Sequence, residues 1–299
     1  MKMKFPQFYM IVICVYLFFI NGCTQINNME IISVPFIKEP QITDNKLKVL
    51  SWNIKMYPAP YGWFFNRRER AENIIQLLKD LDTYDVIFFQ EAFSKSIRNK
   101  IFKGLNNIYS YQIEPNDQTA FYKINSGLWV ISRLPIKLKN QISFTKFSET
   151  DGFASKGAKL FSIIKDNNNI NLIHTHLQSD YSTIYSEVRT HQYSEIYNKL
   201  ILPNENDGIF ILIGDLNISK PLKLKKMLQK LKFNNGPIIG NLQHSIVGNS
   251  KKILDYILVR DNEKIFKSIT RKIIDFSKKL NDKKYNFSDH YPIEAILIW

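Results

Sequence analysis

The stretch GIFILIGDLN (residues 208–217) is apolar for most of its length and then ends in an acid and an amide. A continuous apolar run of this length, bounded by turn residues, predicts a strand buried on both faces. Asp215 and Asn217 lie two residues apart at its end, so we expect their side chains to share a face. A capped turn before SKPLKLKKML is the alternative interpretation of these two residues.

Apolar runs of strand length alternate with amphipathic stretches or loops from Leu47 to the end of the chain. We expect strands at residues 47–54, 85–91, 127–133, 158–165, 170–176, 208–215, 253–259 and 293–299. Helices are predicted at residues 67–81 and 185–201. No internal repeat or Pro/Gly-rich linker divides this region, so the pattern predicts one α/β domain with sheets buried under helices.

Polar residues lie at or near the ends of these apolar runs. They are Asn53, Glu91, His176, Asp215, Asn217, Asp255, Asp289 and His290. A single residue of this kind is usually a turn residue or a cap, but eight in one domain favour a shared site. Buried carboxylates need partners, and a metal ion or an imidazole supplies them.

Six short motifs occur in order along the chain: SWNI, FFQE, THLQ, GDLN, LDYIL and SDHYP. In this order they resemble the endonuclease/exonuclease/phosphatase superfamily, which includes DNase I-like nucleases, inositol polyphosphate phosphatases and sphingomyelinases. The resemblance covers Leu47 to Trp299. It implies a four-layer α/β/β/α sandwich, in which two mostly antiparallel sheets are flanked by helices and the site lies at one edge.

Within this resemblance, Glu91 is the expected ligand of Mg²⁺, with Mn²⁺ or another divalent ion as alternatives, because carboxylate oxygens suit hard cations. Asn53 and Asp289 are expected to share the ion or its waters. A surface acid after a strand is the alternative for Glu91. Asp215 and Asn217 are expected to reach the phosphate or the leaving oxygen.

His290 is the expected general base, and Asp255 is expected to fix its tautomer and stabilise the imidazolium. His176 is expected to hydrogen-bond a phosphoryl oxygen or assist the leaving group, with a buried core histidine as the alternative. We expect His174 to be structural and to point to the face opposite His176.

Two stretches favour the sphingomyelinase branch. TDGFASKGAKLF (residues 150–161) resembles an Asp-x₄-Lys-Gly element of sphingomyelinases, which implies that Lys156 approaches the site through Asp151. SEVRTHQ (residues 186–192) resembles a Val-Arg-Thr-x-Gln stretch on a helix of secreted bacterial sphingomyelinases. A solvated surface lysine is the alternative for Lys156.

Two other stretches bear on membranes. YPAPYGWFFNRRER (residues 57–70) is predicted to be an exposed aromatic loop backed by arginines, which suits either a bilayer surface or a staple onto the core. RKIIDFSKKLNDKKYNF (residues 271–287) lies where haemolytic sphingomyelinases carry an aromatic-rich hairpin. Its lysines and few aromatic residues argue against deep insertion into a membrane.

The first 23 residues predict export from a bacterial cell. A basic start precedes a 13-residue apolar run, FYMIVICVYLFFI, which is typical of a signal peptide and short for a membrane span. Gly22 before Cys23 resembles a lipoprotein signal, so Cys23 is the expected lipidation site; an ordinary secretory signal is the alternative. Residues 24–45 are expected to be a tether and residues 46–299 the catalytic domain.

The formal net charge of +14 favours anionic partners but does not choose between lipid and nucleic acid. The leading hypothesis is a Mg²⁺-dependent phosphodiesterase that cleaves sphingomyelin to ceramide and phosphocholine at a membrane surface, as a monomer. A nuclease and a phosphoinositide phosphatase are the enzyme alternatives. A catalytically inactive surface binding protein is the alternative outside enzymes.

Overall fold

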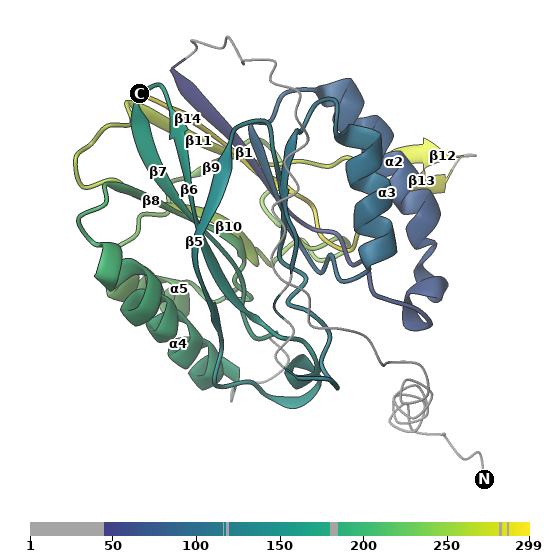
Figure 1. Cartoon of the computed structure of the whole chain (residues 1–299), viewed down its shortest axis with the longest axis horizontal. Coiled ribbons are helices and arrows are strands. Elements are labelled where there is room, and N and C mark those ends of the chain that lie inside the picture. Colours follow the sequence, from purple (N-terminus) through teal and green to yellow (C-terminus); the bar gives the residue numbers. More distant parts are fainter. Residues whose placement is uncertain (1–44, 116, 118–119, 180–184, 281–282, 286) are drawn as a thin grey trace.

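The computed structural model describes residues 45–115, 117, 120–179, 185–280, 283–285 and 287–299. Two β-sheets lie face to face, and helices cover the outer side of each sheet (Figure 1). This is the four-layer α/β/β/α sandwich that the motifs predicted. Residues 1–44, which include Cys23 and nearly all of the predicted signal and tether, lie outside the described residues, so those segments stay predictions.

The larger sheet contains, in spatial order, β3 (Tyr111–Ile113), β4 (Trp129–Ser132), β2 (Val86–Gln90), β1 (Lys46–Asn53), β14 (Ile293–Ile298), β11 (Ser268–Ile273) and β9 (Ile238–Ile239). Its neighbouring strands are antiparallel except for the pairs β1–β2 and β11–β9.

The smaller sheet contains, in spatial order, β10 (Asp255–Arg260), β8 (Ile209–Asp215), β7 (Asn168–His176), β6 (Gly157–Lys165) and β5 (Ile136–Ser143). Only the pair β7–β8 is parallel within it. Both sheets are therefore mostly antiparallel, as expected.

The helical segments lie outside the sheets. In chain order they are η1 (Tyr61–Phe65), α2 (Arg67–Leu81), α3 (Lys95–Leu105), η2 (Glu149–Phe153), α4 (Tyr185–Ile196), η3 (Tyr197–Ile201), η4 (Leu202–Asn204) and α5 (Pro221–Leu231). Helices α2 and α3 pack on the larger sheet, and α4 and α5 pack on the smaller sheet. Helix α2 and the long helix at residues 185–201 were predicted, whereas α3 and α5 were not.

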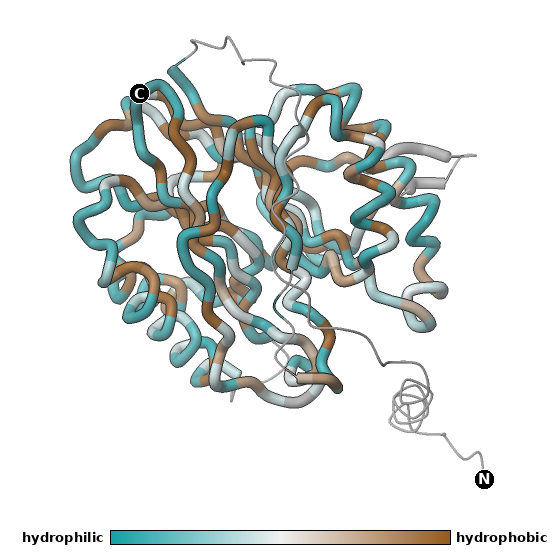
Figure 2. Tube along the Cα trace, viewed as in Figure 1, coloured by the Kyte–Doolittle hydropathy of each residue, from teal (hydrophilic) through white to brown (hydrophobic). Residues whose placement is uncertain are grey.

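Side chains alternate between two cores along each central strand, as the two-residue period of a strand requires. In β8, Ile211 and Ile213 face the core between the sheets, whereas Phe210 and Leu212 face the helices. Strand β8 is buried at every position, which explains its continuous apolar sequence. Figure 2 shows hydrophobic residues following the strands at the centre of the molecule.

A two-stranded hairpin of β12 (Lys278–Leu280) and β13 (Lys283–Tyr285) is separate from both sheets (Figure 1). A hairpin therefore does form in the segment whose composition departs from the sphingomyelinase pattern, and four of its six strand residues are lysines. Among the described residues, no helix is long and apolar enough to cross a membrane.

Candidate active site

The strand ends of both sheets bring the predicted polar residues to one edge of the sandwich. The register pairs Asn53 with Gln90 in the larger sheet, and it pairs Asp215 with both His176 and Asp255 in the smaller sheet. Asn53, His176, Asp215 and Asp255 also share the parity of residues in the core between the sheets. The edge of that core is therefore polar, and it forms the candidate site.

His290 and Asp255 form the hydrogen-bonded pair that the sequence predicted. His290 Nδ1 lies 2.8 Å from Asp255 Oδ2, and His290 Nε2 lies 3.8 Å from Asp215 Oδ2. Burial alone would lower the pKa of His290, but Asp255 and Asp215 oppose it and raise that pKa to about 10. The two carboxylates thus stabilise the imidazolium that forms when His290 takes up a proton.

Asp215 lies at the centre of the site and is almost fully buried. Its Oδ1 accepts a hydrogen bond from the backbone N–H of Asn217 (3.0 Å), and its Oδ2 accepts one from Asn53 Nδ2 (3.2 Å). Burial and the neighbouring Asp255 raise the pKa of Asp215 to about 7, against the opposing effect of His290. Asp215 can therefore carry a proton near neutral pH.

Glu91 follows β2 directly and has a left-handed backbone, with φ of 54°. Its Oε1 accepts a hydrogen bond from Asn53 Nδ2 at 2.9 Å. Its Oε2 is buried and has no hydrogen-bond partner among the described residues. Gly127 packs against this turn, where an added Cβ would lie 3.1 Å from the Cα of Glu91. The packing thus fixes a carboxylate with one free, buried oxygen beside Asn53.

Lys156 connects Asp151 to the site, as the sphingomyelinase-like element predicted. Its Nζ lies 2.9 Å from Asp151 Oδ2, 3.2 Å from His176 Nε2 and 3.0 Å from the carbonyl oxygen of Leu177. An ammonium group only donates, so His176 accepts at Nε2 and carries its proton at Nδ1. That Nδ1 has no partner among the described residues. Burial and Lys156 hold the pKa of His176 well below its usual range.

The Val-Arg-Thr-His-Gln stretch lies on α4 and holds the loop that follows His176. Arg189 donates to the carbonyl oxygens of Gln178 (3.0 Å) and Ser179 (2.8 Å). Gln192 accepts the backbone N–H of Gln178 at 2.8 Å. Asp151 accepts the N–H of Ser179 at 2.8 Å, so the same loop also fixes the partner of Lys156.

Asp289 forms an ion pair that was not predicted from the sequence. Lys55 Nζ lies 2.6 Å from Asp289 Oδ2, at the exposed rim of the site. Burial would lower the pKa of Lys55, but Asp289 and Glu91 raise it, so this side chain stays charged. The role of Asp289 as a metal ligand stays a prediction. The only available signal was the position of Lys55, two residues after the SWNI motif residue Asn53.

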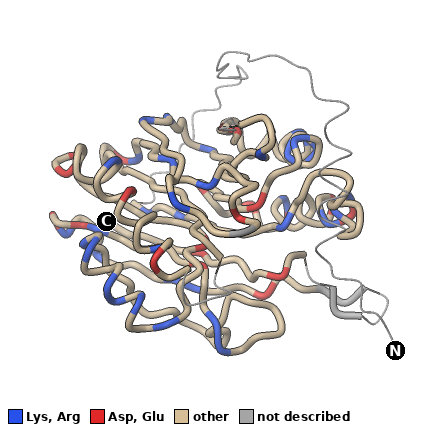
Figure 3. Tube along the Cα trace, turned by 90° about the horizontal axis from the view of Figure 1, so that it is seen from below, with Lys and Arg blue, Asp and Glu red and all other residues tan. Residues whose placement is uncertain are grey.

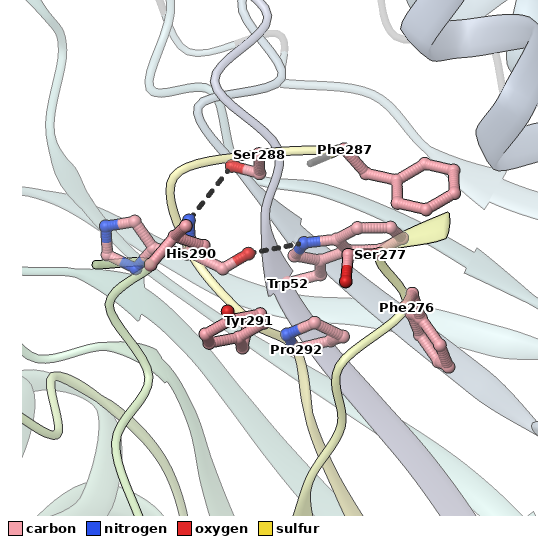
Figure 4. Close-up of a pocket in the computed structure, with 9 residues that line it drawn as sticks. Trp52, Phe276, Ser277, Phe287, Ser288, His290, Tyr291 and Pro292 are labelled. Atoms are coloured by element: carbon pink, nitrogen blue, oxygen red, sulfur yellow. Dashed lines mark hydrogen bonds between the residues drawn. The ribbon is translucent and has the colours of Figure 1, made fainter. Parts of the chain in front are cut away.

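Backbone contacts hold the loop that carries His290 (Figure 4). Trp52 Nε1 donates to the carbonyl oxygen of His290 at 3.1 Å, and its ring meets the edges of Phe276 and Phe287 at the base of the hairpin. Ser288 Oγ donates to the carbonyl oxygen of Asn53 at 2.7 Å. The larger sheet therefore positions the candidate base directly.

The predicted orientation of His174 is wrong, although its structural role is right. Two residues apart on a strand share a face, so His174 and His176 both point toward the larger sheet. His174 Nε2 lies 2.8 Å from Gln90 Nε2, and its ring meets the edge of Phe88. His174 is fully buried beneath the site and away from its opening.

The aromatic stretch at residues 57–70 agrees with both of its interpretations, a bilayer-facing surface and a staple onto the core. Trp63 and Phe64 on η1 are 68% and 75% exposed. The arginines behind them are less available than expected, because Arg67 and Arg70 are buried. Arg67 donates to the carbonyl oxygen of Tyr57 (2.7 Å), and Arg70 donates to that of Phe287 (2.6 Å). Arg70 also donates to the carbonyl oxygen of Phe65 at 3.4 Å, which connects the end of η1 to the body of the protein.

Comparison with known proteins shows the family of this chain. Residues 50–290 match the Endonuclease/Exonuclease/phosphatase family, so the chain belongs to that family. A phospholipase C of Staphylococcus aureus is 26% identical across 86% of this chain and 89% of its own length. A sphingomyelinase C of Listeria ivanovii is 26% identical across 82% of this chain and 84% of its own length.

Solved structures agree with these relatives. Beta toxin 275-280 from S. aureus is 25% identical, with a TM-score of 0.70 over 83% of this chain and 99% of that one. A variant of beta toxin with bound magnesium ions is 24% identical, with a TM-score of 0.68 over 85% of this chain and 99% of that one. The predicted resemblance to bacterial sphingomyelinases is therefore confirmed.

Proposed function

We propose that this chain is a Mg²⁺-dependent phosphodiesterase that hydrolyses sphingomyelin to ceramide and phosphocholine. The observation that carries the proposal is the buried Lys156 ammonium, held between Asp151 Oδ2 and His176 Nε2 at 2.9 and 3.2 Å. Generic phosphodiester chemistry does not require this pair, and it lies beside the Asp255–His290 pair that such chemistry does require. Relatives named sphingomyelinase C support the same substrate.

The donor set at Glu91 fits a hard divalent ion. Glu91 offers a buried oxygen that lacks a partner among the described residues. Asn53 donates its amide N–H to the other Glu91 oxygen and accepts the N–H of Lys55 at its amide oxygen, and Lys55 interacts with both Glu91 and Asp289. Carboxylate and amide oxygens are the ligands that Mg²⁺ prefers, and Mn²⁺ accepts the same donors. When bound, the ion supplies positive charge for the phosphoryl oxygens and lowers the pKa of groups around it.

Different side chains of the site carry out the two proton transfers of the reaction. Asp255 and Asp215 raise the pKa of His290 to about 10, so it is the neutral form of His290, more abundant as the pH rises, that takes a proton from the attacking water. Asp255 stabilises the resulting imidazolium through Nδ1. The water oxygen bonds to phosphorus as the bond from phosphorus to the ceramide oxygen breaks. The protonated form of Asp215, which burial and the neighbouring Asp255 favour, delivers a proton to that leaving oxygen. The Nδ1–H of His176 and the amide of Asn217 donate to phosphoryl oxygens.

A lipid surface is the proposed partner, and the exposed aromatics support it. Trp63 and Phe64 lie exposed on η1. The centre of the Tyr61 ring, on the same helix, lies 5.2 Å from the centre of the Tyr57 ring. Burial and the neighbouring Glu91 raise the pKa of Tyr57. Amphipathic rings of this kind favour the headgroup region of a bilayer. Lysine and arginine spread around the periphery of the molecule add attraction to anionic surfaces (Figure 3).

The proposal includes export and a lipid anchor at Cys23, since the first 23 residues resemble a lipoprotein signal. It also takes the protein to be a monomer. A DNase I-like nuclease is the second candidate, because the net charge of +14 suits nucleic acid as well as a membrane.

One experiment separates these candidates. Purified protein is offered sphingomyelin, phosphatidylcholine, a phosphoinositide and plasmid DNA, each with Mg²⁺ and with EDTA. We expect release of phosphocholine from sphingomyelin when Mg²⁺ is present and no release when EDTA is present. Cleavage of DNA without hydrolysis of any lipid would replace the proposal with the nuclease. Full lipid hydrolysis in EDTA would refute the requirement for a metal.

A further inference from the structure

Lys55 places a fixed positive charge at the acidic rim of the site. Its Nζ lies 2.6 Å from Asp289 Oδ2, with the two side chains 28% and 47% exposed. The same Nζ lies 5.3 Å from the centre of the Phe65 ring, on the η1 side. Asp289 precedes the candidate base His290 in sequence, and its charge contributes to the raised pKa of His290, so this ion pair acts on the reaction centre.

The backbone at the ends of β1 and β2 builds this position. Lys55 and Glu91 both adopt left-handed backbone conformations, with φ of 49° and 54°. Met56 N–H donates to the carbonyl oxygen of Glu91 at 2.9 Å, which ties the two turns together. Arg70 donates to the carbonyl oxygen of Lys55 at 3.2 Å. Lys55 is therefore held beside Glu91 by several contacts rather than by its ion pair alone.

The charges at this rim place Lys55 in competition with a divalent ion. Among the residues that the structure describes, Glu91 and Asp289 are the carboxylates that interact with Lys55, and the Lys55 ammonium already neutralises Asp289. A divalent ion that uses Asp289 must displace that ammonium, and one that uses Glu91 alone still lies near a positive charge. Either arrangement weakens binding by Coulomb repulsion or by loss of the ion pair.

We propose that Lys55 is an internal competitor for Asp289, which sets the affinity of the site for divalent ions. The inference rests on the proposed function, because it takes Glu91 as the ion's main ligand. Removing the ammonium while keeping the length of the side chain frees Asp289 to bind the ion. Lys55→Met should therefore bind Mg²⁺ more tightly than the natural protein, on the order of tenfold.

The test is calorimetric titration of the full chain with MgCl₂, without substrate. Lys55→Met should show a lower Kd, and Lys55→Arg, which keeps the charge, should retain the natural Kd. Lys139→Met is the matched control, because Lys139 pairs with Asp207 at the same 2.6 Å and similar exposures of 25% and 40%. That variant should leave the Kd unchanged. Thermal melting with and without Mg²⁺ provides a second readout of binding.

Asp289→Asn completes the test. If Lys55 acts mainly by competing for Asp289, Lys55→Met should tighten binding clearly less in the Asp289→Asn background, where only the repulsion between Lys55 and an ion at Glu91 is relieved. An unchanged or higher Kd in both Lys55→Met and Lys55→Gln would overturn the inference while leaving the proposed function intact. Failure of natural protein and variants alike to bind Mg²⁺ would overturn both. Tightening of the same size in the Asp289→Asn background as in the natural background would also refute competition for that carboxylate.

Discussion

Replacing Lys156 with methionine should impair catalysis far more than removing any exposed lysine. The Lys156 side chain is 5% exposed, and its ammonium contacts Asp151, His176 and the carbonyl oxygen of Leu177. Loss of one preorganised donor beside reacting groups lowers kcat by about 10²–10³-fold. Removing one partner of a buried ion pair costs about 3–5 kcal/mol of unfolding free energy. Asp151 still accepts the backbone N–H of Ser179 in the variant, so we expect the loss of unfolding free energy to lie at the lower end of its range.

The assay is kcat/KM on sphingomyelin in detergent micelles, which reduces the contribution of membrane attraction. Lys146→Met is the control, because Lys146 is exposed on the same segment of chain and should change both the rate and the stability little. Chemical denaturation measures the free energy of unfolding of each variant, and the assay temperature is set well below both melting points. A folded Lys156→Met variant that keeps most of its kcat/KM would refute the argument that Lys156 acts at the site.

Further variants test other parts of the account. Glu91→Gln should abolish Mg²⁺ binding and most activity, while its melting temperature in EDTA stays near that of the natural protein. His290→Ala and Asp255→Asn should each be severely impaired, and the double variant should be little worse than His290→Ala, because the two residues act as a unit; losses that multiply would disprove the pairing. Trp52→Phe loses the donor to His290 and leaves a cavity at a buried position, so unfolding free energy should fall by more than the about 1 kcal/mol of the hydrogen bond alone, as chemical denaturation would measure. Cys23→Ser should stop incorporation of labelled fatty acid, and labelling that persists would exclude Cys23 as the anchor.

The strand ends of the site were predictable because each follows from a local pattern. An apolar run that stops at an acid or a histidine marks both a strand and its end, as for β8 and Asp215. The motif order then placed Glu91, Asp255 and His290 in one fold. The pairing of Asp255 with His290 was expected from the sequence, and the structure adds the distance of 2.8 Å between His290 Nδ1 and Asp255 Oδ2.

Contacts set by long-range packing were not predictable. Lys55 and Asp289 are 234 residues apart, and their ion pair depends on a left-handed turn at a lysine. The burial of Arg67 and Arg70 likewise depends on carbonyl groups of distant loops and of their own turn. Helix α3 did carry a local signal, because Ile97, Ile101 and Leu105 recur at helical spacing and lie buried on one face.

The central claim is that water, activated at His290, attacks the phosphorus of sphingomyelin. Hydrolysis in water enriched in oxygen-18, followed by mass spectrometry of both products, tests it directly. The account predicts one heavy oxygen in phosphocholine and none in ceramide, with neither product formed by His290→Ala. Heavy oxygen in ceramide, or release of free choline in place of phosphocholine, would contradict it.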